Sequence, residues 1–176
     1  TPEAFKSILD EVNLEFIGAH YGAAHWDEAE RARIREEGLQ IADFVAAVGG
    51  RYIVCSGRRP SRGDVSEDMW AKTAEGLNLL GDECASKDVK LAYHNHWWEC
   101  EQDGLPTLAK YANPETVGFA FDTGHHERAG KNAAELVHAL SERMDIIHLA
   151  DYAKDAGGNV LRPRLGTGVM DMADLR

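Results

Sequence analysis

The segment YHNHWWE at residues 93–99 places two histidines and a glutamate close together. Side chains alternate along a β-strand, so we expect His94 and His96 to face one side while Asn95 faces the other. If that side lines a cavity, the two imidazoles and the carboxylate of Glu99, on the loop that follows, can bind a metal ion and serve as general acid or base. The alternative is a polar strand end whose histidines only hydrogen-bond to the backbone or to each other.

A second segment, FDTGHH at residues 121–126, ends an apolar strand in an acid and places a histidine three residues later. Hard divalent ions prefer carboxylate oxygen, so Asp122 is a candidate metal ligand. His125 is a candidate for holding a substrate hydroxyl or moving its proton. The alternative for Asp122 is that it only caps the next helix. We expect His126 to point outward and to have no role.

A third segment, IIHLAD at residues 146–151, has the apolar pattern of a buried strand interrupted by His148. A lone histidine there is more often a packed core residue. Because a neighbouring strand also ends in an acid, a metal ion shared by the two strands is the simpler interpretation. His20 and His25 are weaker candidates for substrate contact, and we expect His138, within a helix, to be solvated.

Aromatic and basic side chains near these segments are candidates for substrate recognition. Trp97 and Trp98 could wall a sugar site by stacking on its apolar face, although packing in the core or at its rim is as good an explanation. Arg164 and the pair Arg58 and Arg59 could bind a carboxylate or phosphate, with a solvated loop as the alternative.

The elements that must position these residues alternate between two kinds. Amphipathic helices are predicted to begin at Thr1 and to cover about 27–48, 66–80, 105–111 and 135–144. Short apolar strands are predicted at 14–20, 52–56, 89–94, 117–121 and 146–150. Crossover connections of this kind join parallel strands, so the carboxyl ends of all five strands face one way and bring their polar residues to one crater.

Length and charge limit the classes of function. With 176 residues, 44% of them hydrophobic, the chain is predicted to be one α/β domain, residues 1–176. The net charge of −11 and the sequence pI near 5.1 disfavour nucleic acid and anionic lipid as partners. The basic cluster of Arg58, Arg59 and Arg62 suits a solvated turn or a small anionic ligand.

Cysteine spacing and hydropathy indicate the compartment. Cys55, Cys84 and Cys100 lack metal-type spacing and cannot all pair, so we expect reduced thiols and a cytoplasmic protein. No stretch of the sequence is apolar enough to span a bilayer, and we expect no membrane partner.

The motifs YHNHWWE, FDTGHH, IIHLAD and LGTGVMD, in this order, resemble the xylose isomerase-like barrel superfamily. Within it they are most similar to the sugar phosphate isomerase/epimerase group that includes inosose dehydratase-like and tagatose epimerase-like proteins. The resemblance implies a (β/α)₈ TIM barrel, present here as a partial barrel of about five β/α units. These strands would be the third to seventh of eight, and we expect the chain to be a segment of a longer barrel.

The resemblance also implies a ligand set for one divalent metal ion. Family members bind the ion through Glu, Asp, His and a second Glu from the fifth to eighth strands. Asp122 matches the Asp position and His148 the His position. For the first Glu we favour Glu99, with His94 as its substitute, and the last Glu has no counterpart here.

The chemistry implied by the resemblance begins with proton abstraction next to a ketone. Mn²⁺, Co²⁺ or Mg²⁺, with Zn²⁺ as a further possibility, would stabilise the enediolate of a keto-sugar or keto-inositol. Isomerisation, epimerisation and dehydration share this intermediate, and the YHNH and LGTGV segments favour the dehydratase side. We expect His96 and His125 to transfer protons or polarise hydroxyls, and the substrate to be bound by His20, His94, Trp98 and Arg164. A homo-oligomer is possible.

Two other classes compete with this hypothesis. An endonuclease IV-type enzyme of the same superfamily would need more metal ligands and a cationic face for DNA. A non-catalytic barrel fragment would bind sugar or metal without turnover, and restoring the flanking strands would distinguish it from a segment of an enzyme.

Overall fold

The computed structural model describes residues 1–61 and 65–175, so Arg62 of the basic cluster lies outside the described residues. The elements, in chain order, are α1 (Pro2–Glu11), β1 (Gly18–Ala23), α2 (Arg31–Val48), β2 (Tyr52–Gly57), α3 (Glu67–Ala85), β3 (Lys90–His94), α4 (Trp97–Cys100), α5 (Gly104–Tyr111), β4 (Val117–Asp122), α6 (Thr123–Arg128), α7 (Ala133–Leu140), the 3₁₀ turn η1 (Ser141–Arg143), β5 (Met144–His148), β6 (Ala153–Lys154) and β7 (Val160–Leu161). Each of these helices is too short or too polar to cross a bilayer.

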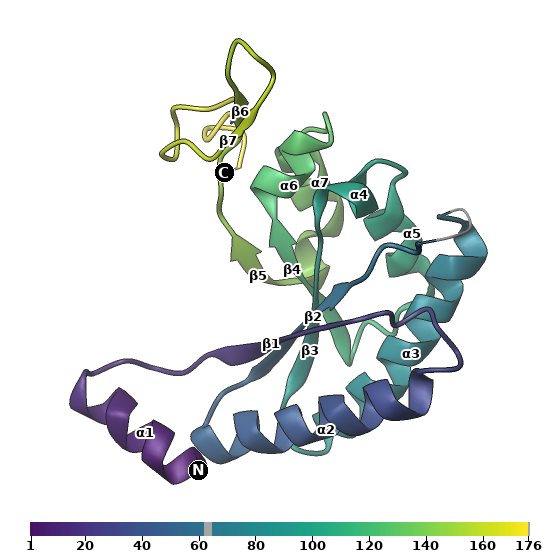
Figure 1. The fold of residues 1–176 in the computed structure, drawn as a ribbon, viewed down its shortest axis with the longest axis vertical. Helices are drawn as coiled ribbons and strands as arrows, with labels where there is room; N and C mark the ends of the chain where they lie inside the picture. The colour runs from purple at the N-terminus through teal and green to yellow at the C-terminus, as the bar shows by residue number, and fades with distance from the viewer. Residues whose placement is uncertain (62–64, 176) are drawn as a thin grey trace.

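Five strands form one parallel sheet in the order β1-β2-β3-β4-β5, which is also their order along the chain. A doubly wound sheet reverses strand order at its centre, whereas a barrel adds each new strand beside the last. The sheet is therefore a segment of a (β/α)₈-type barrel, as the sequence predicts. Figure 1 shows α2 and α3 lying along the sheet, with the excursion that carries β6 and β7 standing off beyond the end of β5.

The two faces of the sheet carry different residues. The outward, helix-covered face is bulky, and side chains such as Ile53, Leu91, Phe119 and Phe121 are at most 1% exposed within the main hydrophobic core. The inward face carries a small separate cluster, namely Val54, Ala92 and Ala120 with Tyr52 and Ile146 packed against it. Strand alternation assigns the faces.

Local capping explains why the long helices begin and end where they do. The Thr1 side chain accepts a hydrogen bond from the N–H of Ala4, and the Ser66 hydroxyl accepts one from Met69. Helix α2 ends at Gly49, which has a left-handed φ of 93°. The caps of α2 and α3 fix the ends of two helices that cover the outward face, while α1 packs against α2.

Several predicted boundaries are wrong. The first strand covers Gly18–Ala23 rather than 14–20, so His20 lies within the strand instead of at its end. The last strand of the sheet covers Met144–His148 rather than 146–150, and the preceding helix ends at Leu140. In both cases the apolar run extends beyond the paired backbone, and several of its residues, such as Leu14 and Leu149, are exposed.

The excursion after β5 is held by one buried carboxylate. Asp151, which is 3% exposed, accepts hydrogen bonds from the backbone N–H groups of Tyr152, Gly166, Gly168 and Met170 at 2.8–3.2 Å. Burial acts to raise the pKa of Asp151, but the four donors together lower it below its ordinary value. The acid of the IIHLAD segment is thus committed to holding the loop that contains LGTGVMD.

Candidate active site

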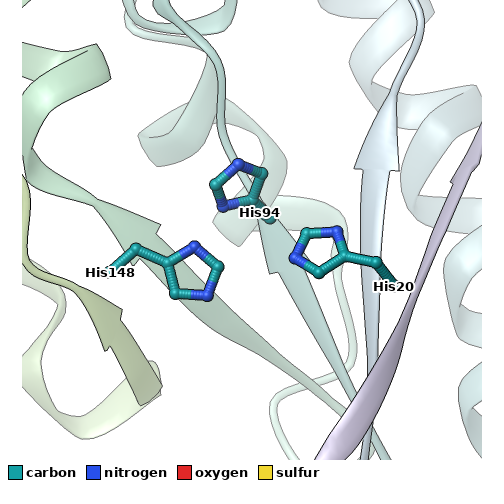
Figure 2. A group of neighbouring side chains, drawn as sticks. All are labelled: His20, His94 and His148. Atoms are coloured by element: carbon teal, nitrogen blue, oxygen red, sulfur yellow. The ribbon is translucent and has the colours of Figure 1, made fainter.

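Three histidines from three strands point toward one another on the inward face (Figure 2). His20 of β1, His94 of β3 and His148 of β5 have ring centroids separated by 5.2 Å for His20 and His94, 4.7 Å for His94 and His148, and 5.7 Å for His20 and His148. One nitrogen of each lies within 4.8 Å of the others. This spacing brings three potential metal ligands to one point.

Small neighbours leave room for these rings. In the row that contains His94, the register places Gly22 beside Ser56, Ser56 beside His94, and His94 beside Ala120. A methyl group added at Gly22 would already lie 3.2 Å from the Ser56 hydroxyl. The inside of a (β/α)₈ barrel is usually filled by branched apolar side chains, so these small residues open a space that imidazoles occupy.

A second group of histidines shares His94. The ring of His96 lies 5.1 Å from His94 and 5.2 Å from His125, and one nitrogen of each of the three lies within 4.8 Å of the others. Strand β3 ends at His94, so His96 is the N-cap of α4. The expected pairing of His94 and His96 on one side is confirmed.

Burial and neighbouring charge keep His94 neutral. Burial, followed by the nearby histidines, lowers the pKa of His94 to about 3. Its Nδ1 lies 3.3 Å from the carbonyl oxygen of Ala120 and can donate a hydrogen bond to it. A proton on Nδ1 leaves the lone pair of Nε2 free, which is the form of histidine that binds metals.

Glu99 is buried on the other side of β3. It is 0% exposed, its Oε1 accepts a hydrogen bond from the Tyr93 hydroxyl at 3.1 Å, and its Oε2 accepts one from the backbone N–H of His96 at 2.6 Å. Tyr93 belongs to the outward face. Both carboxylate oxygens therefore have protein partners outside the group formed by His20, His94 and His148.

Glu99 also affects the neighbouring imidazole. Its Oε2 lies 3.6 Å from Nδ1 of His96, and attraction to this carboxylate raises the pKa of His96. Burial, by contrast, lowers the pKa of His125. The two adjacent rings are thus shifted in opposite directions, which suits a donor and an acceptor of protons.

Asp122 lies opposite His148 in the sheet register, at the end of β4. Its Oδ1 accepts a hydrogen bond from the backbone N–H of His125 at 2.8 Å, so it is the N-cap of α6. The alternative raised for this residue is confirmed, while its second oxygen leaves a ligand role open.

Asn95, predicted only to face away from the two histidines, joins the ends of β3 and β4. Its Oδ1 accepts a hydrogen bond from the N–H of Asp122 at 2.8 Å, and its Nδ2 donates one to the carbonyl of Asp122 at 3.1 Å. Asn95 is 0% exposed. It fixes the separation of His94 and Asp122. In the sequence, its place between two histidines is what could have indicated this role.

The predicted sugar-stacking and anion-binding residues take other positions. Trp98 is 7% exposed and stacks on Trp70 in the core at 5.9 Å, which is the packing alternative. Trp97 is half-buried, with the guanidinium of Arg128 4.8 Å and that of Arg59 5.5 Å from its ring. Arg164 is exposed.

A different arginine lies near His125. Arg162, together with Arg128, lines a cavity of about 30 Å³ that also contains Asp122 and His125. Both guanidinium groups contribute to lowering the pKa of His125. Arg162 lies two residues from Arg164 on a loop. The sequence has no periodic pattern there that would predict which of the two arginines lies near His125.

The remaining histidines are structural or solvated. His25 is 2% exposed and burial lowers its pKa to about 4. His126 packs at 5.2 Å on Phe121 of the outward face, so it points away from the histidine groups as predicted, and it is buried there at 7% exposure. His138 is exposed, as predicted, with Nε2 3.0 Å from the carbonyl oxygen of Asp174.

Residues 1–176 match the family described as the xylose isomerase-like TIM barrel. The chain belongs to this family. Among curated relatives of this TIM-barrel chain, an inosose dehydratase of Clostridium perfringens is 29% identical over 93% of the chain. The chain spans 59% of the length of that relative.

Solved structures support the same fold for this member of the xylose isomerase-like family. A probable 3-DHS dehydratase from Bacillus anthracis superposes with a TM-score of 0.78 at 14% identity, covering 98% of this chain and 69% of that one. The IolI protein, crystallised with a zinc atom, superposes with a TM-score of 0.76 at 18% identity, covering 97% of this chain and 66% of that one. The predicted family and barrel fold are confirmed.

Proposed function

We propose that this chain forms the metal-binding and proton-transfer part of an enzyme that isomerises, epimerises or dehydrates a keto-sugar or keto-inositol through an enediolate. The observation that carries the proposal is the convergence of His94, His96, His125 and His148 with Asp122 at the carboxyl ends of parallel strands. Barrels of this type place their chemistry at this end. The similarity to inosose dehydratases favours dehydration.

A divalent ion fits the residues on the inward face. The Nδ1 of His94 lies beside the Ala120 carbonyl, and a histidine that donates one N–H to a carbonyl presents its other nitrogen to a metal. We assign the ion to His94 and His148, with Asp122 beside His148. His94 stands here in place of Glu99, whose oxygens have other partners. The zinc found in the IolI relative is consistent with a divalent ion.

Such an ion supplies Lewis acidity, which stabilises the negative charge that develops on the substrate oxygen when the neighbouring carbon loses its proton. The residues of the chain do the rest. His125, with its pKa lowered by burial, is suited to accept a proton, and His96, with its pKa raised beside Glu99, is suited to return one or to protonate a departing hydroxyl. Arg162 and Arg128 add positive charge at the rim.

The test measures metal content and turnover of the full-length protein with 2-keto-myo-inositol and a panel of ketohexoses, before and after removal of metal by EDTA. We expect one bound divalent ion, activity that EDTA abolishes and that divalent metal restores, and loss of both metal and turnover in His148→Ala. Asp122→Asn should lower both, and His138→Ala, at an exposed position of α7, should change neither.

Two outcomes would contradict the proposal. A folded protein that binds no divalent ion would refute the metal assignment. A protein that binds the ion and the sugar without turnover would be a binding protein instead, which is the non-catalytic alternative.

A further inference from the structure

We propose that His20 is a third metal ligand, so that the ion is held by the imidazoles of His20, His94 and His148 and is a zinc-type ion instead of Mg²⁺ or Mn²⁺. The inference rests on the proposed function and specifies its metal. It departs from the ligand set implied by family resemblance, in which carboxylates predominate and β1 supplies no ligand.

The position of His20 follows from the alternation of β1. Its neighbour Tyr21 faces the helices, where its hydroxyl lies 3.1 Å from the carbonyl of Ile34 and 2.9 Å from Oε2 of Glu37. Anchoring Tyr21 outward forces the preceding residue inward. Figure 2 shows the ring of His20 directed at the other two, with its centroid 5.2 Å from that of His94.

The imidazole of His20 has no competing role within the described part of the chain. It is exposed in the middle of β1, and no described residue hydrogen-bonds to its ring. Gly18 and Gly22, two residues away on either side, add no side chains to the same face. Rotation of the side chain can therefore bring its nitrogen closer to a shared ion.

Oxygen ligands are scarce at this point. Glu99 uses its two oxygens for Tyr93 and the His96 backbone, and Asp122 uses one for the N–H of His125, so only the second Asp122 oxygen is left to join the imidazoles. The three-residue groups whose ligand atoms converge here consist of histidines alone among the described residues. Imidazole suits Zn²⁺, Co²⁺ and Ni²⁺, whereas Mg²⁺ and Mn²⁺ prefer carboxylate, carbonyl and water. Three histidines with one open position is also a known catalytic zinc composition.

The first experiment needs no variant. The full-length protein, stripped of metal, is titrated with Co²⁺ and its visible absorption is recorded, because a nitrogen-rich site of low coordination number absorbs strongly and an octahedral oxygen-rich site weakly. We expect strong visible bands that Zn²⁺ displaces at one equivalent and that a large excess of Mg²⁺ does not. A weak spectrum, or displacement by Mg²⁺, would overturn the assignment.

The second experiment assigns the ligand. His20→Ala should lower Zn²⁺ affinity at least about 10-fold, as measured by competition with a chromophoric chelator. Removing a residue that only hydrogen-bonds to a metal ligand already costs about 10-fold or more, so loss of a ligand should cost at least as much. The same variant should also weaken the Co²⁺ bands. His138→Ala is the matched control and should change neither. Circular dichroism of the stripped proteins checks that both variants fold.

The outcomes separate this inference from the proposed function. If wild type binds one ion and turns over sugar, but His20→Ala changes only KM, then His20 is a substrate contact and the three-histidine assignment fails while the proposed function stands. If wild type binds no divalent ion at all, both fail. Loss of Zn²⁺ affinity in Glu99→Gln without any loss in His20→Ala would restore the carboxylate set.

Discussion

The inward and outward faces of the same five strands differ in almost every property of their side chains. Outward residues such as Leu91 and Phe119 are large, apolar and at most 1% exposed, and helices cover them. Inward residues alternate with them one position along, and in the row that contains His94 the neighbours Gly22, Ser56 and Ala120 are small. The same five strands thus carry a stabilising outward face and a reactive inward face, because successive side chains along each strand point to opposite faces.

The difference indicates how stability and chemistry are divided. Hydrophobic burial on the outward face supplies the free energy of folding. In the row that contains His94, small residues replace the branched side chains that would add to this free energy, and imidazoles occupy the space. Substitutions on the two faces should therefore have separable effects.

The largest expected effect is on stability, from the outward face. Phe119→Ala should lower the free energy of unfolding by about 3–5 kcal/mol, because a fully buried ring is lost and a cavity remains. Urea denaturation followed by circular dichroism measures it. Metal affinity of the protein that remains folded should be unchanged, and a loss of metal binding without a loss of stability would contradict the division between faces.

The inward face should show the converse. His125→Ala is expected to lower kcat about 100-fold, the lower end for a general acid or base because His96 lies 5.2 Å away and can partly substitute. Its free energy of unfolding should change by less than about 1 kcal/mol, as for a half-buried side chain outside the core. Steady-state kinetics and urea denaturation are measured on the same preparation, with His138→Ala as control.

Asp151 belongs to neither face and tests whether the excursion unfolds separately. Asp151→Asn should destabilise the loop by about 1–3 kcal/mol, because four backbone donors lose a charged acceptor. Hydrogen exchange should quicken at Gly166, Gly168 and Met170, and protection in β3 should persist. Equal loss of protection in both regions would contradict a separate loop.

The same carboxylate gives a pH dependence with a definite sign. The pKa of Asp151 is lowered in the fold, so its stabilising contribution is complete above the ordinary aspartate pKa of about 3.9 and is lost as the pH falls below it. Protection of the loop amides should decline on acidification below about pH 4. Asp151→Asn should remove this dependence.

The smallest expected effect is at the end of α2. Gly49→Ala should cost about 1 kcal/mol, because alanine is strained at a φ of 93° while its methyl group would meet nothing within 4 Å. Thermal denaturation measures it. A much larger loss would mean that the end of this helix, and not only the outward core, determines stability.

Alternation and motif order made much of this structure predictable from the sequence. Parallel strands, their shared carboxyl ends and the closeness of His94, His96, His125 and His148 follow from short apolar runs that end in polar residues. The position of His20 did not, because a strand placed at 14–20 puts it at the end of β1 instead of between Gly18 and Gly22. The backbone pairing that begins only at Gly18 decides this, and it depends on β2.

The environment of Glu99 was also not predictable from the sequence. Its spacing from His96 is that of a capping box, which a four-residue helix satisfies, but its burial beneath Tyr93 depends on packing between elements. Trp98 packs on Trp70 in the core, and Arg164 lies two residues from Arg162, which lines a cavity with His125. The directions of these side chains depend on how the four-residue helix α4 packs and on the path of the loop after β7, and no periodic pattern in the sequence encodes either.

Asn95 continues the sheet past the point where its strands end. Its amide offers one donor and one acceptor to Asp122, the same pair that a peptide group in a neighbouring strand would offer. The Asn95 side chain thus replaces one more pair of backbone hydrogen bonds at the place where the chain leaves β3 for α4. The consequence is mechanical. The segments that continue from β3 into α4 and from β4 into α6 start from the same pair of hydrogen bonds, so their first residues should fluctuate together and not independently.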